Sequence, residues 1–438
     1  MRSFFKKIVI SILTLEARVA LKRHKPSVIA ITGNVGKTST KDAIYAVVSH
    51  AYGAGAVRKS EKSFNSEFGL PLAILGLETA WSSPSGWLRN LRQGFRAAFF
   101  GANFPEWLVL EVGADHPGDI RNASRWLHPD VVVLTRMSDI PVHVEYFKDA
   151  EEVLREKMFL AHALKPGGTI VVNADDPHFE RAVRDIAAAK AFYGAKKGID
   201  AEIVSSEISY DGEALPLPVG QNVVVRMNRL GKEKEAEISL AGVLGDHLAY
   251  PIAAACAVAG VLDIASAVPA AFRDFESPKG RMRILPGANS SAIIDDSYNS
   301  SPLASAEALK TMAKLSLKGK KVAILGDMKE LGASAEKAHR DIGRLAADAL
   351  HTLAVVGDMA EFIATGAIEA GMAADRVMHF ESSLAAGAAI RDIIRAGDAV
   401  LVKGSQSMRM EQASKALLAD PEKAADLLVR QEKEWLSR

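Results

Sequence analysis

Short apolar runs recur along this chain, and segments with helical spacing of apolar and polar positions separate them. Four runs lie in the first half, at residues 28–31, 107–111, 131–134 and 169–173. Four more lie in the second half, at 292–295, 321–325, 353–356 and 399–402. Apolar runs that alternate with helices are typical of buried parallel strands. We therefore predict an α/β protein with two sheets that are rich in parallel strands.

The pattern changes between the two blocks. Segments 222–226 and 236–240 alternate apolar and polar positions and are separated by glycine and charged residues, which predicts hairpins. An alanine-rich helix is expected over 247–262, and residues 276–280 contain Pro278 and Gly280, as a hinge would. We predict three parts: a helix over 1–26, a central domain over 27–279, and a Rossmann-like α/β domain over 280–438.

Composition narrows the functional class. The 438 residues are 48% hydrophobic and 24% charged, with a formal net charge of +1. This is the balance of a globular protein of two or three domains, and it provides no overall field for binding nucleic acid. The single cysteine, Cys256, excludes a disulfide framework and a multi-cysteine metal site.

The N-terminal segment has two interpretations. Basic residues at Arg2, Lys6 and Lys7 precede an apolar run over 8–13, which Glu16 interrupts. The run is shorter than the roughly 20 apolar residues that span a bilayer. We expect an amphipathic helix that packs on the protein, and the alternative is peripheral contact with a membrane surface.

The most informative motif is Thr32-Gly-Asn-Val-Gly-Lys-Thr38, which lies between the apolar run 28–31 and a helical pattern. A strand, a glycine-containing loop ending in Lys-Thr, and a helix form a phosphate cradle. Backbone amides would face the anion, Lys37 would reach the terminal phosphates, and the Thr38 hydroxyl would bind Mg²⁺. Ile31 stands where the strict pattern has glycine, so an ordinary strand-to-helix turn is the alternative interpretation.

Four further candidate features follow the phosphate loop along the chain. Glu111 ends an apolar run, where a carboxylate is costly unless it is paired or binds a metal. His143 lies in an apolar setting, where a lone histidine is more often structural than a ligand. Lys157 lies in the helical segment 149–164, where a solvated lysine is usual. Asp295 and Asp296 end another run, where they could bind a ribose or a metal or cap a helix.

In order along the chain, these motifs resemble those of the Mur ligase family. The segments that carry the resemblance are Thr32 to Lys41, Asn65 to Pro71, Leu110 to His116, Glu156-Lys157, Asn173 to Asp176, Asp295 to Pro302, Leu325 to Gly332 and Val402 to Glu411. The last three segments are most similar to the branch of the family that adds a dipeptide. The resemblance spans residues 28–417 without large gaps.

The resemblance implies a cytoplasmic, ATP-dependent ligase that forms an amide bond in peptidoglycan precursor synthesis. A substrate carboxylate would take the γ-phosphate of ATP, and an amine would then attack the acyl phosphate. The dipeptide-adding branch joins D-Ala-D-Ala to a UDP-muramoyl tripeptide. The implied cofactors are ATP and two Mg²⁺ ions, with Lys157 at the position of the family's carbamylated lysine.

The resemblance also implies roles for individual residues. Catalytic roles are expected for Lys37, Glu111, His143 and Lys157. Metal contacts are expected from Thr38, Glu111, His143 and Lys157. Nucleotide contacts are expected from Gly33, Asn34, Val35, Gly36, Lys37, Thr38, Ser39, His247, Arg281 and Asp296. Substrate contacts are expected from Asn65, Tyr298, Asn299, Lys403 and Ser405.

The chain departs from the family in four places, one of which is the loop from Thr135 to His143, longer than usual and with Arg136 where asparagine is customary. About thirty residues precede the phosphate loop, fewer than the usual N-terminal UDP-sugar-binding domain requires. The family's Gly-x-His-Asn element reads Gly245-Asp-His247-Leu248 here, without the asparagine. Residues 79–103, with Trp81 and several arginines, look like an insertion.

Two alternatives follow from these departures. The first is a related ligase with a different carboxylate acceptor, such as a poly-amino-acid, a folate or a lipid-linked precursor. The second is an ATP-binding scaffold without turnover. In each case we expect small-molecule partners, no nucleic acid, a monomer, and peripheral membrane contact only through the N-terminal helix.

Overall fold

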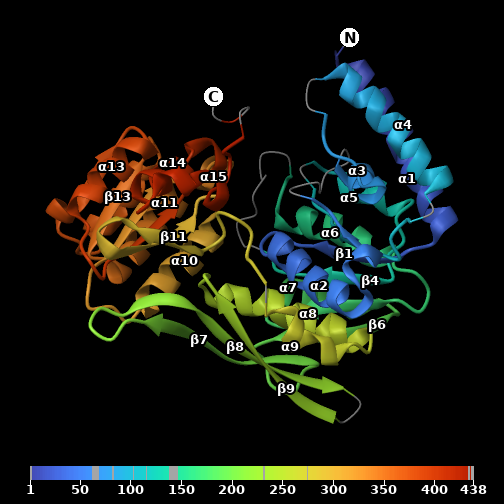
Figure 1. The fold of residues 1–438 in the computed structure, drawn as a ribbon, viewed down its shortest axis with the longest axis horizontal. Coiled ribbons are helices and arrows are strands. Elements are labelled where there is room, and N and C mark those ends of the chain that lie inside the picture. Colours follow the sequence, from blue (N-terminus) through green and yellow to red (C-terminus); the bar gives the residue numbers. More distant parts are fainter. Residues whose placement is uncertain are drawn as a thin grey trace. The chain divides into compact units, whose positions relative to one another are not determined.

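The computed structural model describes residues 2–61, 69–80, 83–101, 103–114, 116–137, 147–229, 232–273, 275–432 and 435, with the side chains of 2–7, 84, 229, 232 and 247 left out. Two compact units divide the chain. The first comprises residues 1–204, 224–238 and 250–274, and the second comprises 205–223, 239–249 and 275–438. Each unit is an α/β structure built around a sheet, which confirms the predicted fold class (Figure 1).

The first unit contains most of a nine-stranded sheet of order β2-β3-β1-β4-β5-β6-β7-β8-β9. The strands are β1 (Ser27–Thr32), β2 (Val57–Lys59), β3 (Trp107–Glu111), β4 (Val131–Leu134), β5 (Thr169–Asn173), β6 (Ala189–Gly194), β7 (Ala201–Asp211), β8 (Leu217–Arg229) and β9 (Lys232–Ala241). The pairs from β2 to β7 are parallel. Strands β7 to β9 contribute residues to both units.

The helices of the first unit are α1 (Arg2–His24), α2 (Lys37–Tyr52), α3 (Gly69–Leu75), α4 (Pro84–Phe100), α5 (Asp119–Ser124), α6 (Ala150–His162), α7 (Pro177–Ala182), α8 (Ala249–Val261), whose first residue belongs to the second unit, and α9 (Val268–Ala271). Four of them, α1, α2, α6 and α8, correspond to the predicted helical segments. No helix in the described ranges is long and apolar enough to cross a membrane.

The central strands are apolar on both faces because both faces are buried. Val28 and Ala30 of β1 belong to one core, which α1, α3, α6 and α7 also line. Ile29 and Ile31, which point to the opposite face, are also fully buried. Continuous apolar strands are expected in a sheet that is buried on both faces. The strands could therefore be predicted from the apolar runs in the sequence.

Strand register places polar residues at one edge of this sheet. Ile31 pairs with Glu111, and Thr32 pairs with Leu134, so β1, β3 and β4 end side by side. The carboxyl ends of parallel strands are where ligands bind in open α/β sheets. The phosphate loop leaves β1 at this edge.

The second unit contains a six-stranded sheet of order β10-β11-β15-β12-β13-β14. Only the β10–β11 pair is antiparallel. The strands are β10 (Arg283–Gly287), β11 (Ser291–Asp296), β12 (Lys321–Gly326), β13 (Thr352–Val356), β14 (Val377–Phe380) and β15 (Ala399–Lys403). The helices are α10 (Pro302–Lys314), α11 (Ala335–Ala349), α12 (Ala360–Glu369), α13 (Ser383–Ile393), α14 (Glu411–Leu417) and α15 (Ala424–Leu427).

The carboxyl ends of the central strands also meet in the second unit. Asp296 of β11 pairs with Lys403 of β15, and Leu325 of β12 pairs with the same lysine on its other side. The predicted Asp295–Pro302 motif therefore leaves the sheet beside the Lys403 motif, although about a hundred residues separate them in sequence.

Candidate active site

The phosphate loop of the first unit joins the end of β1 to the start of α2. Gly36 adopts a φ of 86° and precedes the first helical residue, Lys37. The amides of the first helical turn have no partner within a helix, so they remain available to an anion. The Lys37 ammonium donates a hydrogen bond to the Asn34 carbonyl oxygen at 3.1 Å, which places its charge over the loop.

The segment after β4 holds this loop in place. The amides of Asn34 and Val35 donate to the carbonyl oxygen of Arg136, at 2.7 and 3.2 Å. The Thr135 hydroxyl lies 2.8 Å from the carbonyl oxygen of Val35 and donates to it. Gly33 is required here, since its φ is 148° and a Cβ would lie 2.0 Å from the Thr135 hydroxyl oxygen.

Glu111 faces the start of α2. The Thr38 hydroxyl donates to a carboxylate oxygen of Glu111 at 2.8 Å, and this glutamate is only 2% exposed. The amide of Glu111 donates to the Ser60 hydroxyl at 3.0 Å, and the Lys41 ammonium donates to the Ser60 carbonyl at 2.8 Å. A hydroxyl and a carboxylate, side by side at a strand edge, are oxygen ligands of the type that Mg²⁺ prefers.

The residues of the loop fit a nucleotide phosphate and its metal ion. The side-chain oxygen of Asn34 is buried and has no hydrogen-bond partner in the described structure. A buried polar atom of this kind is costly and is expected where a ligand or water completes it. The paired oxygens of Thr38 and Glu111 fit a metal ion bound beside such a ligand.

Lys157 lies on α6 and is 3% exposed. The neighbouring Glu156 accepts hydrogen bonds from the amides of Ile120 and Arg121, at 2.7 and 3.0 Å, and so caps the start of α5. Nothing in the sequence indicated this role for Glu156, because no local pattern predicts that a helix will be capped by a side chain 36 residues away. The cap fixes α6 beside α5 and so fixes the backbone that carries Lys157.

A second polar cluster lies at the strand ends of the second unit. The Lys403 ammonium lies 2.5 Å from a carboxylate oxygen of Asp296 and 3.1 Å from the carbonyl oxygen of Asn299. Both charged side chains are nearly buried. Lys403 therefore binds the loop after β11 at two points, and this loop contains Tyr298 and Asn299.

Asp295 precedes this loop and points into the protein. It accepts a hydrogen bond from the Ser414 hydroxyl at 2.7 Å and is fully buried. Burial raises the pKa of Asp295 from 3.8 to about 6, because the ionised form is disfavoured in an apolar interior. Of the two acids in the motif, Asp296 forms an ion pair with Lys403, and Asp295 hydrogen bonds to Ser414 inside the protein.

The C-terminal segment holds the same loop from the other side. Arg430 donates to the carbonyl oxygens of Ser297, at 3.2 Å, and of Tyr298. Its guanidinium also pairs with Glu411 at 3.0 Å, with both side chains buried. The guanidinium of Arg281 lies 4.3 Å from the centre of the Tyr298 ring. Arg430 lies outside every motif, and sequence reasoning missed it.

Ser405 takes part in a third set of contacts. Its hydroxyl accepts from the amide of Lys329 at 2.8 Å, and its own amide donates to the carbonyl of Asp327 at 3.0 Å. The carboxylate of Asp327 pairs with the Lys329 ammonium at 2.6 Å and accepts from the first amide of α12. The Gly-Asp-Met-Lys motif after β12 is thus joined to the Lys403 motif after β15.

Several predicted residues cannot be placed. Asn65 and His143 lie outside the described residues, and for His247 only the backbone is described, in a short 3-10 helix over Asp246–Leu248. Within the described ranges, no three His, Cys, Asp or Glu side chains gather as a metal cluster. The structure brings together Lys37, Asn34, Thr38 and Glu111, and separately Asp296, Asn299 and Lys403.

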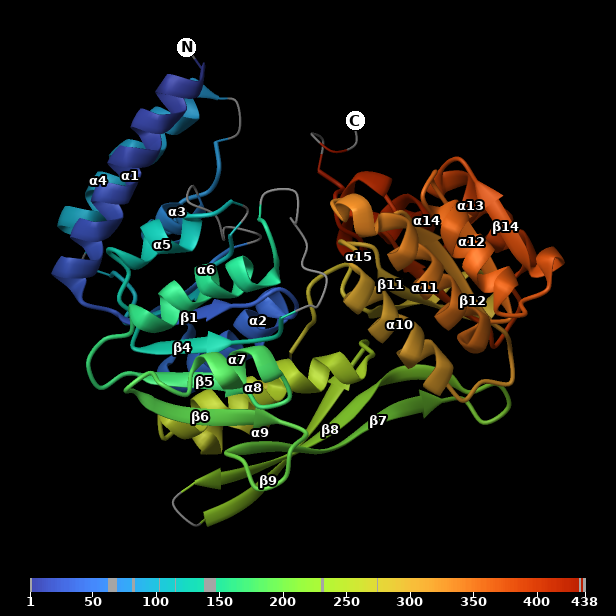
Figure 2. The same ribbon diagram turned by 180° about the vertical axis from the view of Figure 1, so that it is seen from behind.

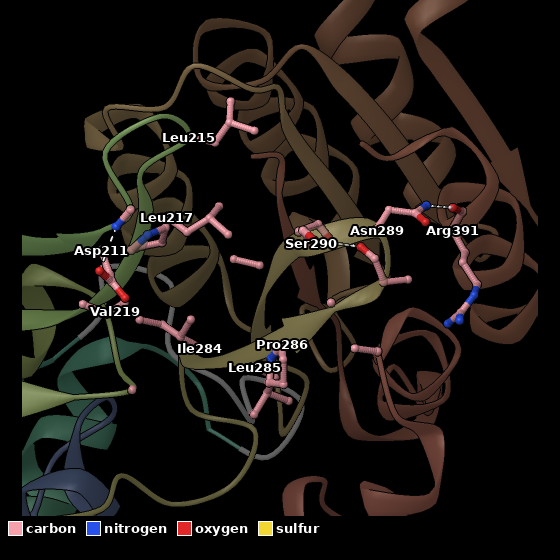
Figure 3. Close-up of a pocket in the computed structure, with 18 residues that line it drawn as sticks. Asp211, Leu215, Leu217, Val219, Ile284, Leu285, Pro286, Asn289, Ser290 and Arg391 are labelled. Atoms are coloured by element: carbon pink, nitrogen blue, oxygen red, sulfur yellow. Dashed lines mark hydrogen bonds between the residues drawn. The ribbon is translucent and has the colours of Figure 1, made fainter. Parts of the chain in front are cut away.

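A cavity of about 820 Å³ lies in the second unit, between the turn that joins β7 to β8 and the strands β10 and β11 (Figure 3). Leu215, Leu217, Val219 and Ile284 line it, with Asn289 and Arg391 at its far end. None of the residues predicted to bind nucleotide or substrate lines this cavity.

Comparison with known proteins identifies families that this chain resembles. Residues 91–259 match the Mur ligase middle domain, and residues 280–406 match the Mur ligase glutamate ligase domain. The Bacillus subtilis UDP-N-acetylmuramoyl-tripeptide–D-alanyl-D-alanine ligase is 27% identical over 92% of this chain and 79% of its own length. The protein of the same name from Mycobacterium tuberculosis is 29% identical over 90% of this chain and 73% of its own.

Solved structures show the same fold. MurF from Acinetobacter baumannii superposes with a TM-score of 0.73 at 22% identity, covering 93% of this chain and 79% of that one. MurF ligase from Thermotoga maritima, solved in complex with ADP, gives 0.72 at 22% identity, covering 95% and 84%. With both domain matches in order along the sequence, the chain belongs to the Mur ligase family.

Proposed function

We propose that this protein is an ATP-dependent ligase that adds D-Ala-D-Ala to a UDP-muramoyl tripeptide in peptidoglycan precursor synthesis. The observation that carries the proposal is the match to ligases of that name over about nine tenths of the chain. Phosphate-loop contacts and the dipeptide-branch motifs after β11, β12 and β15 support it.

In this proposal ATP is a substrate, and the residues of the first unit hold its phosphates. The carboxylate of the acceptor attacks the γ-phosphorus, ADP leaves, and the amine then displaces phosphate from the acyl phosphate. Lys37 and the amides at the start of α2 place positive charge where negative charge accumulates on the transferring group. Such preorganised charge supplies much of the catalysis in phosphoryl transfer.

Metal binding is assigned to the oxygens of Thr38 and Glu111 and to His143. Magnesium, when bound, would neutralise phosphate charge. Lys157 is nearly fully buried on α6, and a carbamate at its side-chain nitrogen would give a carboxylate-like metal ligand there. With ¹³C-bicarbonate, the native protein should show a carbamate carbon signal that Lys157→Ala lacks. Full activity of Lys157→Ala would contradict the role.

In the second unit, Asp296 and Arg281 are assigned to the nucleotide, and Tyr298, Asn299, Lys403 and Ser405 to the acceptor or amine. Support comes from the joint fixation of these residues at the carboxyl ends of β11, β12 and β15. This is the edge at which open α/β sheets present side chains to ligands.

The deciding experiment measures ADP release with Mg-ATP, UDP-muramoyl tripeptide and D-Ala-D-Ala, and then omits each component in turn. We expect release only when all three are present, and a ligated product of the summed mass less water. Tight ATP binding without release would contradict this acceptor, and folate and lipid-linked carboxylates would then be assayed in its place. ATP binding without turnover on any acceptor would favour a scaffold.

A further inference from the structure

Helices α1 and α4 form a pair at one side of the first unit (Figures 1 and 2). The ring of His24, near the end of α1, hydrogen bonds to the carbonyl oxygen of Ala97, near the end of α4, at 3.1 Å. Three residues earlier on α4 and eight residues earlier on α1, Gly94 lets the helices approach, since a Cβ there would lie 2.2 Å from a carboxylate oxygen of Glu16. The two helices therefore run side by side in the same direction.

Each helix has one buried face. On α1, Val9, Leu13, Ala17 and Ala20 are buried in the core of the unit. On α4, Trp87 and Ala98 are buried in the same core, with Asn90 donating to the carbonyl oxygen of Glu78. Because these contacts already attach the pair to the unit, the exposed faces are not needed for folding.

The opposite faces expose large apolar side chains. On α1, Ile8, Ile12 and Leu15 are exposed, and their spacing of four and three residues places them on one stripe. On α4, Leu88 is 61% exposed and Phe95, seven residues later, is 47% exposed. Single exposed apolar residues are common on proteins, but two stripes on paired helices indicate an interaction surface.

Basic side chains accompany these stripes. Between them the helices contain nine lysines and arginines and one acid, Glu16, in a chain whose net charge is +1. Glu16 is buried between the helices, and burial raises its pKa to about 7. On α4, Arg89, Arg92 and Arg96 are all exposed and occupy the strip next to Leu88 and Phe95.

We propose that the exposed faces of α1 and α4 together bind the surface of an anionic phospholipid bilayer. An apolar stripe beside a basic stripe suits the boundary between acyl chains and headgroups. The arginines would contact lipid phosphates while Leu88 and Phe95 enter the apolar layer. Neither helix is long and apolar enough, over its described residues, to cross the bilayer, so the binding is peripheral. The charge excess selects an anionic membrane over a second copy of the same basic surface.

Vesicle flotation with the full chain tests the proposal. We expect binding to phosphatidylcholine vesicles that contain about 30 mol % phosphatidylglycerol, and little binding to phosphatidylcholine alone, because polybasic attraction requires anionic lipid. Raising the salt concentration several-fold should release the protein, since exposed charges are screened.

Two variants separate the charge contribution from the apolar one. Replacing Arg89, Arg92 and Arg96 by glutamine should lower partitioning by about tenfold or more and weaken its salt dependence, because only the basic residues of α1 remain. The matched control replaces Lys318, Arg376 and Lys423, exposed residues of the second unit, by glutamine. It makes the same change in net charge and should bind as the native protein does.

The apolar contribution is tested with Leu88→Ser together with Phe95→Ser, against Ile368→Ser, an exposed apolar residue of α12. The double variant should bind more weakly but keep its salt dependence. Far-UV circular dichroism and ATP binding report whether each variant is folded.

Three outcomes would overturn the proposal. The first is equal binding of the native protein to neutral and anionic vesicles. The second is native-like binding by a folded arginine variant. The third is a concentration-dependent dimer, seen by light scattering without lipid and abolished by the Leu88 and Phe95 changes, together with no binding to vesicles. That last result would assign the surface to a second copy of the chain.

Discussion

The two polar clusters of this protein are built in different ways. In the first unit, the phosphate loop is contiguous: Gly33, Asn34, Gly36, Lys37 and Thr38 lie within six residues, between one strand and one helix. In the second unit, the loop after β11 is held by residues from distant motifs.

The second cluster illustrates the distance in sequence. Lys403 binds Asp296 and Asn299 from more than a hundred residues away, and Arg430 reaches Ser297 and Tyr298 from 132 or more. A contiguous loop keeps its phosphate-facing groups together through its own strand and helix, and distant contacts such as that of Thr135 with Val35 only reinforce it. A loop assembled from distant parts depends on each part being in place.

The largest expected effect is on the contiguous loop. Lys37→Ala should lower ADP release by about 10²–10³-fold, because it removes one preorganised positive charge from the transferring phosphate. Its free energy of unfolding should change little, since Lys37 is only half-buried and lies at the start of α2, outside the apolar core. The control is Lys197→Ala, an exposed lysine of the same unit. Lys37→Ala with native turnover would contradict the site.

The next effect falls on the assembled loop. Arg430→Ala leaves the buried Glu411 without one of its two arginine partners and removes two bonds to the loop carbonyls. Breaking a buried ion pair from one side costs about 3–5 kcal/mol. Urea unfolding should show a loss near the lower end, because Arg409 still pairs with Glu411.

Arg430→Lys sharpens this comparison, because it keeps the charge and loses the guanidinium fork. It should fall between Arg430→Ala and the native protein in stability. Arg376→Ala, an exposed arginine of the same unit, should be close to native. Unfolding midpoints for Arg430→Ala equal to those of Arg376→Ala would show that the C-terminal segment does not support the loop.

A third test uses pH and Asp295, the buried acid that precedes the assembled loop. The native pKa of Asp295 is raised from 3.8 to about 6, so the native state retains a proton that the unfolded chain has lost. The free energy of unfolding therefore falls as pH rises from about 4 to about 6 and is level above that range. A shift of about two pKa units corresponds to about 3 kcal/mol.

Asp295→Asn should remove this dependence, because the amide accepts from Ser414 without ionising. The measurement is urea unfolding between pH 4 and pH 7, approximately the range over which the native carboxyl titrates. The slopes of Asp295→Asn and of the native protein should differ in this range. Identical slopes would assign the pH dependence to other carboxyls.

The smallest effect tests how local the phosphate loop is. Thr135 lies outside the loop, and its hydroxyl donates to the carbonyl of Val35. Thr135→Val removes this bond and should cost about 1 kcal/mol, seen as a several-fold rise in the KM for ATP with little change in kcat. Thr135→Ser keeps the hydroxyl and serves as the control. A fall in kcat as large as that of Lys37→Ala would show that the loop is not locally determined.

The central strands were predictable because each is a continuous, buried apolar run. Strands β3, β4 and β5 occupy the predicted residues, and β1, β11, β12, β13 and β15 extend them by one or two positions. The site was predictable where chemistry and sequence are contiguous, as in Gly33 to Thr38. Lys157 and Tyr298 were identified only through the family resemblance, since a lysine on a helix and an aromatic in a loop carry no signal of their own.

Arg430, Thr135 and Glu156 were not predicted, because each acts through backbone groups of a segment distant in sequence. No sequence pattern specifies which carbonyl or amide such a side chain will meet. The exposed face of α4 could not be predicted either, because apolar residues at helical spacing, such as Leu88 and Phe95, are as compatible with a buried face.

The sequence by itself determined the α/β class, the positions of the buried strands and the phosphate loop, because these follow from local periodicity and from glycine and lysine at fixed spacing. Tertiary structure alone decided which acid of the Asp295–Asp296 pair meets Lys403, and which faces of α1 and α4 remain exposed. Those outcomes depend on strand register and on packing between segments far apart in the chain, which local sequence does not encode.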